Sequence, residues 1–177
     1  MRAFSISVCL LLAAAAVPAQ APRRAPGFSL PDANSQQKDL ADYRGKVVIV
    51  DFMKTDCEHC GAFSQILEQV NTRYRGRVVV LSIAPAPDSP VTISQFRAKF
   101  GVTYPILFDC GQVAFSYIRP NPLNPAIALP RFFIVGPDGY ILKDFEFGPQ
   151  TQEIFRGQGL FSELDRILAR LGKGEKL

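Results

Sequence analysis

The chain has 177 residues, 47% of them hydrophobic, which is enough for one domain with a sizeable core but short for two. Its formal net charge is +4, and the 20 lysines and arginines are interspersed among the 16 acidic residues. This pattern is typical of a solvated surface and gives no indication of nucleic-acid binding.

The N-terminus has the pattern of an export signal. Arg2 precedes the apolar run 6–17, and small residues at Val17 and Ala19 mark the expected cleavage point. A membrane-spanning helix needs roughly 20 apolar residues, so we expect a cleaved signal peptide at 1–19 and a periplasmic or secreted protein. The alternative is an uncleaved segment that anchors the protein to a membrane.

The remaining chain is interpreted as one unit with short ends. We expect a tether at 20–24, a single domain at 25–172 and a C-terminal tail at 173–177.

The central part of the chain predicts an α/β fold. The continuous apolar run 46–52 predicts a strand buried on both faces. Apolar residues spaced by three and four from Phe63 to Tyr74 predict a helix that ends at Gly76. The apolar run 78–84 then completes a βαβ unit with two parallel strands.

The second half continues with alternating short elements. Ser89 and Pro90 have the pattern of a helix N-cap and first residue, and Gly101 ends that helix. The further elements are a strand at 104–108, a helical turn or two at 112–118, a proline-rich loop at 119–130, a hairpin of strands 132–135 and 140–147, and a last helix at about 161–171.

Cysteines carry the clearest chemical signal. Cys9 lies in the expected signal peptide, which leaves Cys57, Cys60 and Cys110 in the exported chain. Cys110 is expected to be a small buried apolar side chain, with a third redox thiol as the alternative.

Cys57 and Cys60 are the candidate reactive pair in the run Cys57-Glu58-His59-Cys60. At a junction of strand and helix, cysteines with this spacing can reach the Cα separation of roughly 4.4–6.8 Å that a disulfide tolerates. Cys57 lies at the expected helix start, where the helix dipole lowers a thiol pKa, and is therefore the expected nucleophile. Cys60 is the expected resolving thiol. A static structural disulfide is the alternative.

A metal site is not expected. Zinc needs four ligands, whereas the exported chain offers three cysteines and His59, which is adjacent to Cys60. We expect no metal and no other cofactor.

The order of strand, Cys57-x-x-Cys60, helix, strand, late proline, hairpin and terminal helix resembles the thioredoxin superfamily, especially its exported TlpA/ResA-like branch with a redoxin (AhpC/TSA-like) domain. Residues 25–30, Leu40 and 43–48 look like the N-terminal β extension of that branch. The resemblance implies a thioredoxin fold, with a central mixed β-sheet flanked by helices, and thiol–disulfide oxidoreductase activity. The implied partners are protein thiols and disulfides in exported proteins, apocytochromes or another oxidoreductase.

Two further residues match motifs of that family. Asp51 matches a buried aspartate near the second cysteine, and a carboxyl on an apolar strand has a raised pKa and can take a proton from a thiol. Pro130 matches the cis-proline opposite the disulfide, which implies that the backbone of Leu129 pairs with an extended substrate. The alternatives are a solvated strand-end aspartate and an ordinary trans proline.

The residues around the cysteines modulate the expected chemistry. As an imidazolium, His59 would stabilise the Cys57 thiolate and raise the reduction potential, whereas the negative charge of Glu58 opposes a thiolate. The direction of exchange is therefore open. The tryptophan that usually precedes the first cysteine is absent, and 53–56 occupies its place.

Three other functions share some of these sequence features. A peroxiredoxin has a threonine three residues before its peroxidatic cysteine, and here that position is Lys54, with Thr55 one place off. A copper chaperone needs cysteines four apart and a distant histidine, which the single His59 nearly excludes. A non-catalytic binding module that uses the loop 119–130 is the third.

Overall fold

The computed structural model describes residues 23–120, 123 and 127–175. The expected signal peptide at 1–19, with Cys9, lies outside these residues, as do parts of the proline-rich loop and the last two residues of the expected tail. None of the helices in the described ranges has both the length and the hydropathy that crossing a bilayer requires.

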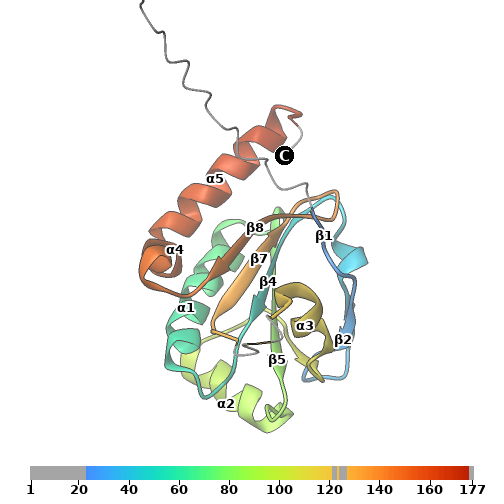
Figure 1. Ribbon diagram of the computed structural model, residues 1–177, viewed down its shortest axis with the longest axis vertical. Helices are drawn as coiled ribbons and strands as arrows, with labels where there is room; N and C mark the ends of the chain where they lie inside the picture. The colour runs from blue at the N-terminus through green and yellow to red at the C-terminus, as the bar shows by residue number, and fades with distance from the viewer. Residues whose placement is uncertain (1–22, 121–122, 124–126, 176–177) are drawn as a thin grey trace, which may run out of the picture.

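A six-stranded mixed sheet lies at the centre, in the order β1-β8-β7-β4-β5-β6 (Figure 1). Its strands are β1 (Arg23–Arg24), β4 (Val47–Phe52), β5 (Val78–Pro85), β6 (Ile106–Asp109), β7 (Arg131–Val135) and β8 (Tyr140–Glu146). A second, two-stranded sheet contains β2 (Ser29–Pro31) and β3 (Gln37–Asp39). The N-terminal β extension and the central mixed sheet therefore agree with the predicted α/β fold.

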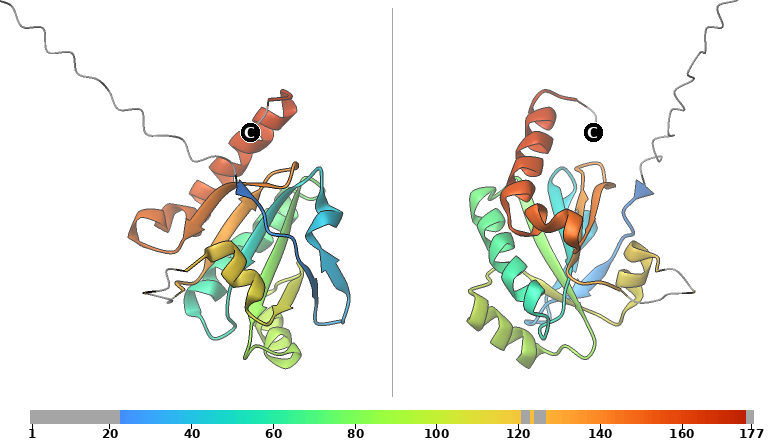
Figure 2. Two further views of the ribbon diagram at one scale, coloured as in Figure 1. Left: turned by 45° about the vertical axis from the view of Figure 1, so that its right-hand side comes forward. Right: turned by 60° about the vertical axis from the view of Figure 1, so that its left-hand side comes forward.

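Helices cover both faces of the central sheet (Figure 2). They are η1 (Leu40–Tyr43), α1 (Glu58–Arg73), α2 (Pro90–Phe100), α3 (Gln112–Ile118), η2 (Pro149–Thr151), α4 (Gln152–Phe155) and α5 (Gln158–Gly172). Apolar residues of α1, α2, α4 and α5 pack in one core cluster, and those of α3 pack on the opposite face of the sheet. The sheet is thus the middle layer of three.

β4 is the central strand, and all six of its residues are buried. It pairs in parallel with β5 and antiparallel with β7. Because side chains alternate along a strand, Val47 and Ile49 face the α1 side, and Val48, Val50 and Phe52 face the α3 side. Asp51 follows the same alternation and faces α1.

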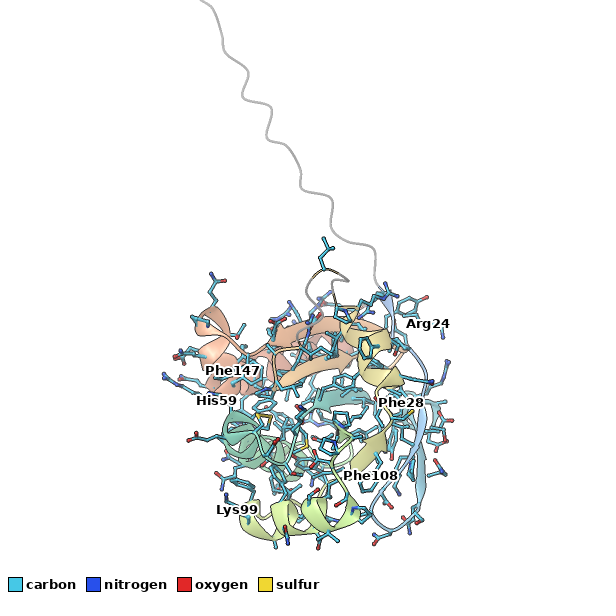
Figure 3. All side chains as sticks on the ribbon, turned by 60° about the horizontal axis from the view of Figure 1, so that its bottom comes forward. Arg24, Phe28, His59, Lys99, Phe108 and Phe147 are labelled. Atoms are coloured by element: carbon cyan, nitrogen blue, oxygen red, sulfur yellow. A yellow bond between two sulfur atoms is a disulfide. The ribbon has the colours of Figure 1, made fainter. Side chains whose placement is uncertain are left out.

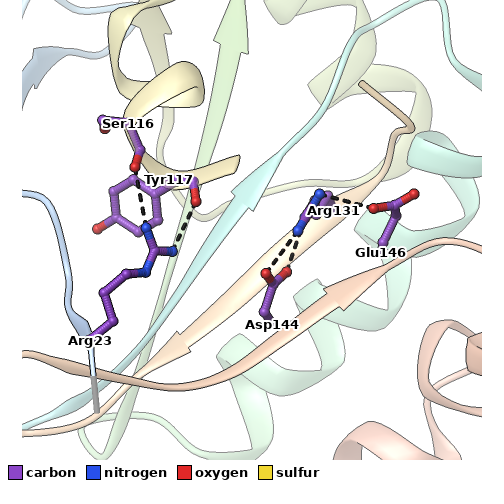
Figure 4. Close-up of polar contacts among 6 residues, drawn as sticks. All are labelled: Arg23, Ser116, Tyr117, Arg131, Asp144 and Glu146. Atoms are coloured by element: carbon purple, nitrogen blue, oxygen red, sulfur yellow. Dashed lines mark hydrogen bonds and ion pairs between the residues drawn. The ribbon is translucent and has the colours of Figure 1, made fainter. Parts of the chain in front are cut away.

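The hairpin of β7 and β8 matches the prediction closely and is tied by a charged cluster. The guanidinium of Arg131 donates to Asp144 Oδ1 and Oδ2 at 3.0 and 2.8 Å and to Glu146 Oε2 at 2.9 Å (Figure 4). A guanidinium that binds a carboxylate with two nitrogens fixes the geometry of both groups.

Two differences from the predicted elements concern the ends of the domain. Arg23 and Arg24, assigned to the tether 20–24, pair with β8 as strand β1. The guanidinium of Arg23 also donates to the carbonyl oxygens of Ser116 and Tyr117 at 3.3 and 2.9 Å (Figure 4). These carbonyl groups lie in the last turn of α3, where the helix itself provides no N–H partner. An edge strand of two residues has no sequence periodicity, so its formation depends on contact with β8 and α3.

The second difference is at the C-terminal helix, expected at about 161–171. It begins earlier, at Gln158, and is preceded by the short helix α4. Gly157, with φ +100°, separates the two helices in a conformation that favours glycine.

Gly61 in α1 makes a close approach to α2. A Cβ atom at this position would lie 2.3 Å from Cζ of Phe100.

We expect Gly61→Ala to lower the free energy of unfolding by about 1–2 kcal/mol. The added methyl group displaces the Phe100 ring, and the cost of this overpacking exceeds the gain from the higher helix propensity of alanine. Chemical denaturation measures the change. In a Phe100→Ala background the clash is absent, so the same substitution should stabilise the protein by about 1 kcal/mol; destabilisation there would contradict this explanation.

Candidate functional site

Cys57 and Cys60 form a disulfide at the start of α1, with Cα atoms 5.2 Å apart. Cys57 is the N-cap residue of the helix, and its Sγ accepts the backbone N–H of Cys60 at 3.2 Å. Cys57 is half-buried, whereas Cys60 is only 2% exposed. Of the two cysteines, only Cys57 is therefore open to a partner.

The loop between β4 and α1 is held by the start of the neighbouring helix α2. Asp88 accepts the backbone N–H of Thr55 at 3.1 Å and the hydroxyl of Thr55, and also the hydroxyl of Thr92 at 3.0 Å. The carboxylate thus connects the segment before Cys57 to the first turn of α2. Sequence reasoning missed Asp88, because the helix start at Ser89 and Pro90 was the only visible signal there.

Asp51 is fully enclosed in the sheet, with 2% of its surface exposed. The hydroxyl of Ser82 donates to its Oδ2 at 2.6 Å, and its Oδ1 has no hydrogen-bond partner within the described part of the chain. Burial raises the pKa of Asp51 to about 7, and the hydrogen bond from Ser82 opposes the shift only in part. Asp51 is thus buried, as its apolar neighbours on the strand predict.

Asp51 and Cys60 lie on the same side of the sheet. Cys60 belongs to the α1-side core cluster, together with Ile49 and Met53, which flank Asp51 at alternating positions of the chain. Tyr104 joins them in this cluster, and burial together with the negative charge of Asp51 raises the pKa of the Tyr104 hydroxyl. The carboxyl group therefore shares an apolar environment with the buried cysteine.

Leu129 and Pro130, just before β7, lie next to the disulfide. The peptide bond between them is cis, and the carbonyl oxygen of Leu129 lies 4.0 Å from Sγ of Cys57. Leu129 is half-buried and Pro130 is buried just before β7. A second cis bond, Ala86–Pro87, follows β5 and was not anticipated from the sequence.

Glu58 and His59 are both exposed in the first turn of α1. The carboxylate of Glu58 lies where the helix dipole favours negative charge. The imidazole of His59 stacks on the ring of Phe147, with centroids 4.3 Å apart and planes at 26° (Figure 3). The sequence indicates only that Phe147 ends a strand, and no sequence signal predicts its position beside His59.

Cys110 is exposed, so the expectation of a buried side chain was wrong. Its neighbour Asp109 is buried and accepts the backbone N–H groups of Val113 and Ala114 at 3.3 and 3.0 Å. Because Asp109 turns inward to bind the first turn of α3, the next side chain turns toward solvent.

The fold is shared with known oxidoreductases. A thioredoxin-family thiol:disulfide interchange protein from Chlorobium tepidum superposes with a TM-score of 0.66 at 17% identity, covering 80% of this chain and 97% of that one. A secreted disulfide oxidoreductase of Mycobacterium tuberculosis superposes with a TM-score of 0.59 at 21% identity, covering 76% and 95%. These similarities show the thioredoxin fold.

Sequence relatives lead to the family. Proteins named thiol-disulfide oxidoreductase ResA are 25% identical over 135 residues in Bacillus thuringiensis (76% of this chain, 74% of the relative) and 26% identical over 129 residues in Geobacillus kaustophilus (73% and 70%). The model of the AhpC/TSA family matches residues 22–143, which is more than half of the chain. The chain therefore belongs to the AhpC/TSA family and is a TlpA/ResA-like oxidoreductase of the thioredoxin superfamily.

Proposed function

We propose that this chain is an extracytoplasmic thiol–disulfide oxidoreductase that exchanges disulfides with protein partners through Cys57 and Cys60. The observation that carries the proposal is the disulfide at the start of α1, in which Cys57 is half-buried and Cys60 is buried. The relatives named thiol-disulfide oxidoreductase ResA support the chemistry. The expected signal peptide at 1–19 supports the location.

A partner would bind beside the Leu129–Pro130 bond. The Leu129 carbonyl oxygen, 4.0 Å from Sγ of Cys57, can accept a backbone N–H from an extended segment of the partner. Such pairing would place a partner sulfur next to Cys57. Partners with cysteines in extended, accessible segments fit this geometry, as in exported proteins during folding, apocytochromes or another oxidoreductase.

The exchange is a reversible two-step transfer. A partner thiolate attacks Sγ of Cys57, the Cys57–Cys60 bond breaks, and Cys60 leaves with the electron pair and takes a proton from Asp51. A second partner thiolate then attacks the partner's own sulfur, which forms the partner disulfide and releases Cys57 as a thiolate. In the reverse direction Cys57 attacks a partner disulfide, and Cys60 resolves the mixed disulfide after giving its proton to Asp51.

Asp51 is suited to this proton transfer because its pKa is close to neutrality. A carboxyl with an ordinary pKa of about 3.9 would not hold a proton at pH 7. With the pKa raised to about 7, Asp51 can both donate and accept a proton there. The unpartnered Oδ1 leaves one oxygen available for that exchange.

The geometry favours thiol exchange over peroxide reduction. Both the backbone N–H and the hydroxyl of Thr55 bind Asp88, so this hydroxyl is not directed at a molecule bound beside Cys57. Lys54 occupies the position of the peroxidatic threonine and carries no hydroxyl.

Replacing the buried sulfur should trap the first intermediate. In Cys60→Ser the mixed disulfide between Cys57 and a partner cannot be resolved, so covalent adducts should accumulate on export to the periplasm. Non-reducing electrophoresis followed by mass spectrometry would detect them. The matched variant Cys57→Ser should form none, and an absence of adducts in Cys60→Ser would contradict the proposal.

Asp51 should make the stability of the oxidised protein depend on pH. Between pH 4 and 7 the unfolded chain has lost the Asp51 proton while the folded protein retains it, so the free energy of unfolding falls as the pH rises. The difference between an ordinary aspartate pKa and a pKa of about 7 corresponds to at most about 4 kcal/mol in the free energy of unfolding. Asp51→Asn cannot ionise, so its stability relative to the wild type should increase from pH 4 to 8. Urea unfolding at several pH values measures this, and parallel profiles for the two proteins would refute it.

A further inference from the structure

The stack of His59 on Phe147 lies directly beside the disulfide. His59 is the only residue between Glu58 and Cys60, in the turn that carries both cysteines. Its ring is nearly parallel to that of Phe147, at 26° with a centroid separation of 4.3 Å, and the two side chains meet at the surface (Figure 3). An exposed imidazole on a free helix turn would sample several rotamers, whereas this stack selects one orientation.

Phe147 is itself held firmly by the protein. Its backbone N–H donates to the carbonyl oxygen of Pro130 at 3.1 Å, which ties it to the loop that contacts Cys57. Its ring meets Phe155 edge to face at 5.3 Å, and Phe155 in turn packs on Phe63 and Phe132 in the core. The half-buried Phe147 ring is therefore a rigid platform against which the exposed imidazole of His59 is placed.

The charged groups around the stack do not repel a cationic imidazole. On its own helix the nearest acid is Glu58. On the strand that leads to Phe147, the single positive charge of Arg131 is shared between Asp144 at 2.8 Å and Glu146 at 2.9 Å, which leaves a net negative charge. On α4, Glu153 lies 3.7 Å from Arg156, and these two charges largely cancel. An aromatic face attracts a cation, so the Phe147 ring can hold a charged imidazole in the stacked orientation.

We propose that Phe147 is a positioning residue that sets the reduction potential of the Cys57–Cys60 pair through His59. The inference rests on the proposed thiol–disulfide exchange. An imidazolium held at the helix start stabilises the Cys57 thiolate, and hence the dithiol form, relative to the disulfide. Loss of the aromatic ring releases the imidazole and removes the attraction to its charge, so the equilibrium moves toward the disulfide.

The equilibrium with glutathione measures this effect. Protein disulfide and two molecules of reduced glutathione form protein dithiol and one molecule of glutathione disulfide, with two electrons and two protons transferred to the protein. For Phe147→Leu we expect an equilibrium constant about three- to fivefold lower than for the wild type, equivalent to a potential about 14–21 mV lower. Phe147→Tyr keeps an aromatic face and should retain the wild-type value.

A double-mutant cycle separates positioning from packing. In a His59→Gln background there is no imidazole to position, so Phe147→Leu should leave the glutathione equilibrium unchanged. Thermal unfolding of each oxidised variant verifies that it is folded. An unchanged or higher constant in Phe147→Leu, or an equal decrease with and without His59, would overturn the inference. A pair that fails to equilibrate with glutathione in the wild type would instead contradict the proposed function.

Discussion

The burial of β4 on both faces is the constraint on which the active site depends. β4 is paired with β5 on one side and with β7 on the other, and the chain leaves the C-terminal end of this strand through a short loop into α1. Cys57 is therefore placed where unpaired backbone N–H groups of a helix start meet solvent. The antiparallel register pairs Phe52 with Arg131, so Leu129 and Pro130, just before β7, arrive at the same end of the sheet.

The same registers supply the groups that surround the disulfide. The parallel pairing of β4 with β5 sets Asp51 opposite Ser82, whose hydroxyl donates a hydrogen bond to the buried carboxyl. The pairing of Arg131 with Glu146 brings the end of β8 to the start of β7, and Phe147 follows Glu146 immediately. The disulfide, the buried Asp51 carboxyl, the Leu129–Pro130 bond and Phe147 are thus brought together by three strand pairings.

A destabilising group at the centre of the sheet has a functional explanation. An unpaired carboxyl oxygen in an apolar core is costly, and replacing it by an uncharged side chain is favourable for folding at neutral pH. Asp51 is nevertheless located on the face that it shares with Cys60, where its raised pKa suits the proton transfer that we propose for resolution. The aromatic contacts around Phe155 and Phe132 lie on this face as well, and they compensate through apolar burial.

The sequence by itself determined the central elements and the reactive pair. Buried strands, amphipathic helices and a Cys-x-x-Cys run at a strand–helix junction all have local patterns, so 46–52, 78–84 and the roles expected for Cys57 and Cys60 could be derived from neighbouring residues. Asp51 could be inferred for the same reason, because its apolar neighbours on the strand predict burial. Tertiary structure alone decided that Arg23 and Arg24 join the sheet, that Cys110 faces solvent and that Phe147 stacks on His59. Each of these depends on contact with a segment distant in the chain or on the inward turn of a neighbouring side chain, for which no periodicity exists in the sequence.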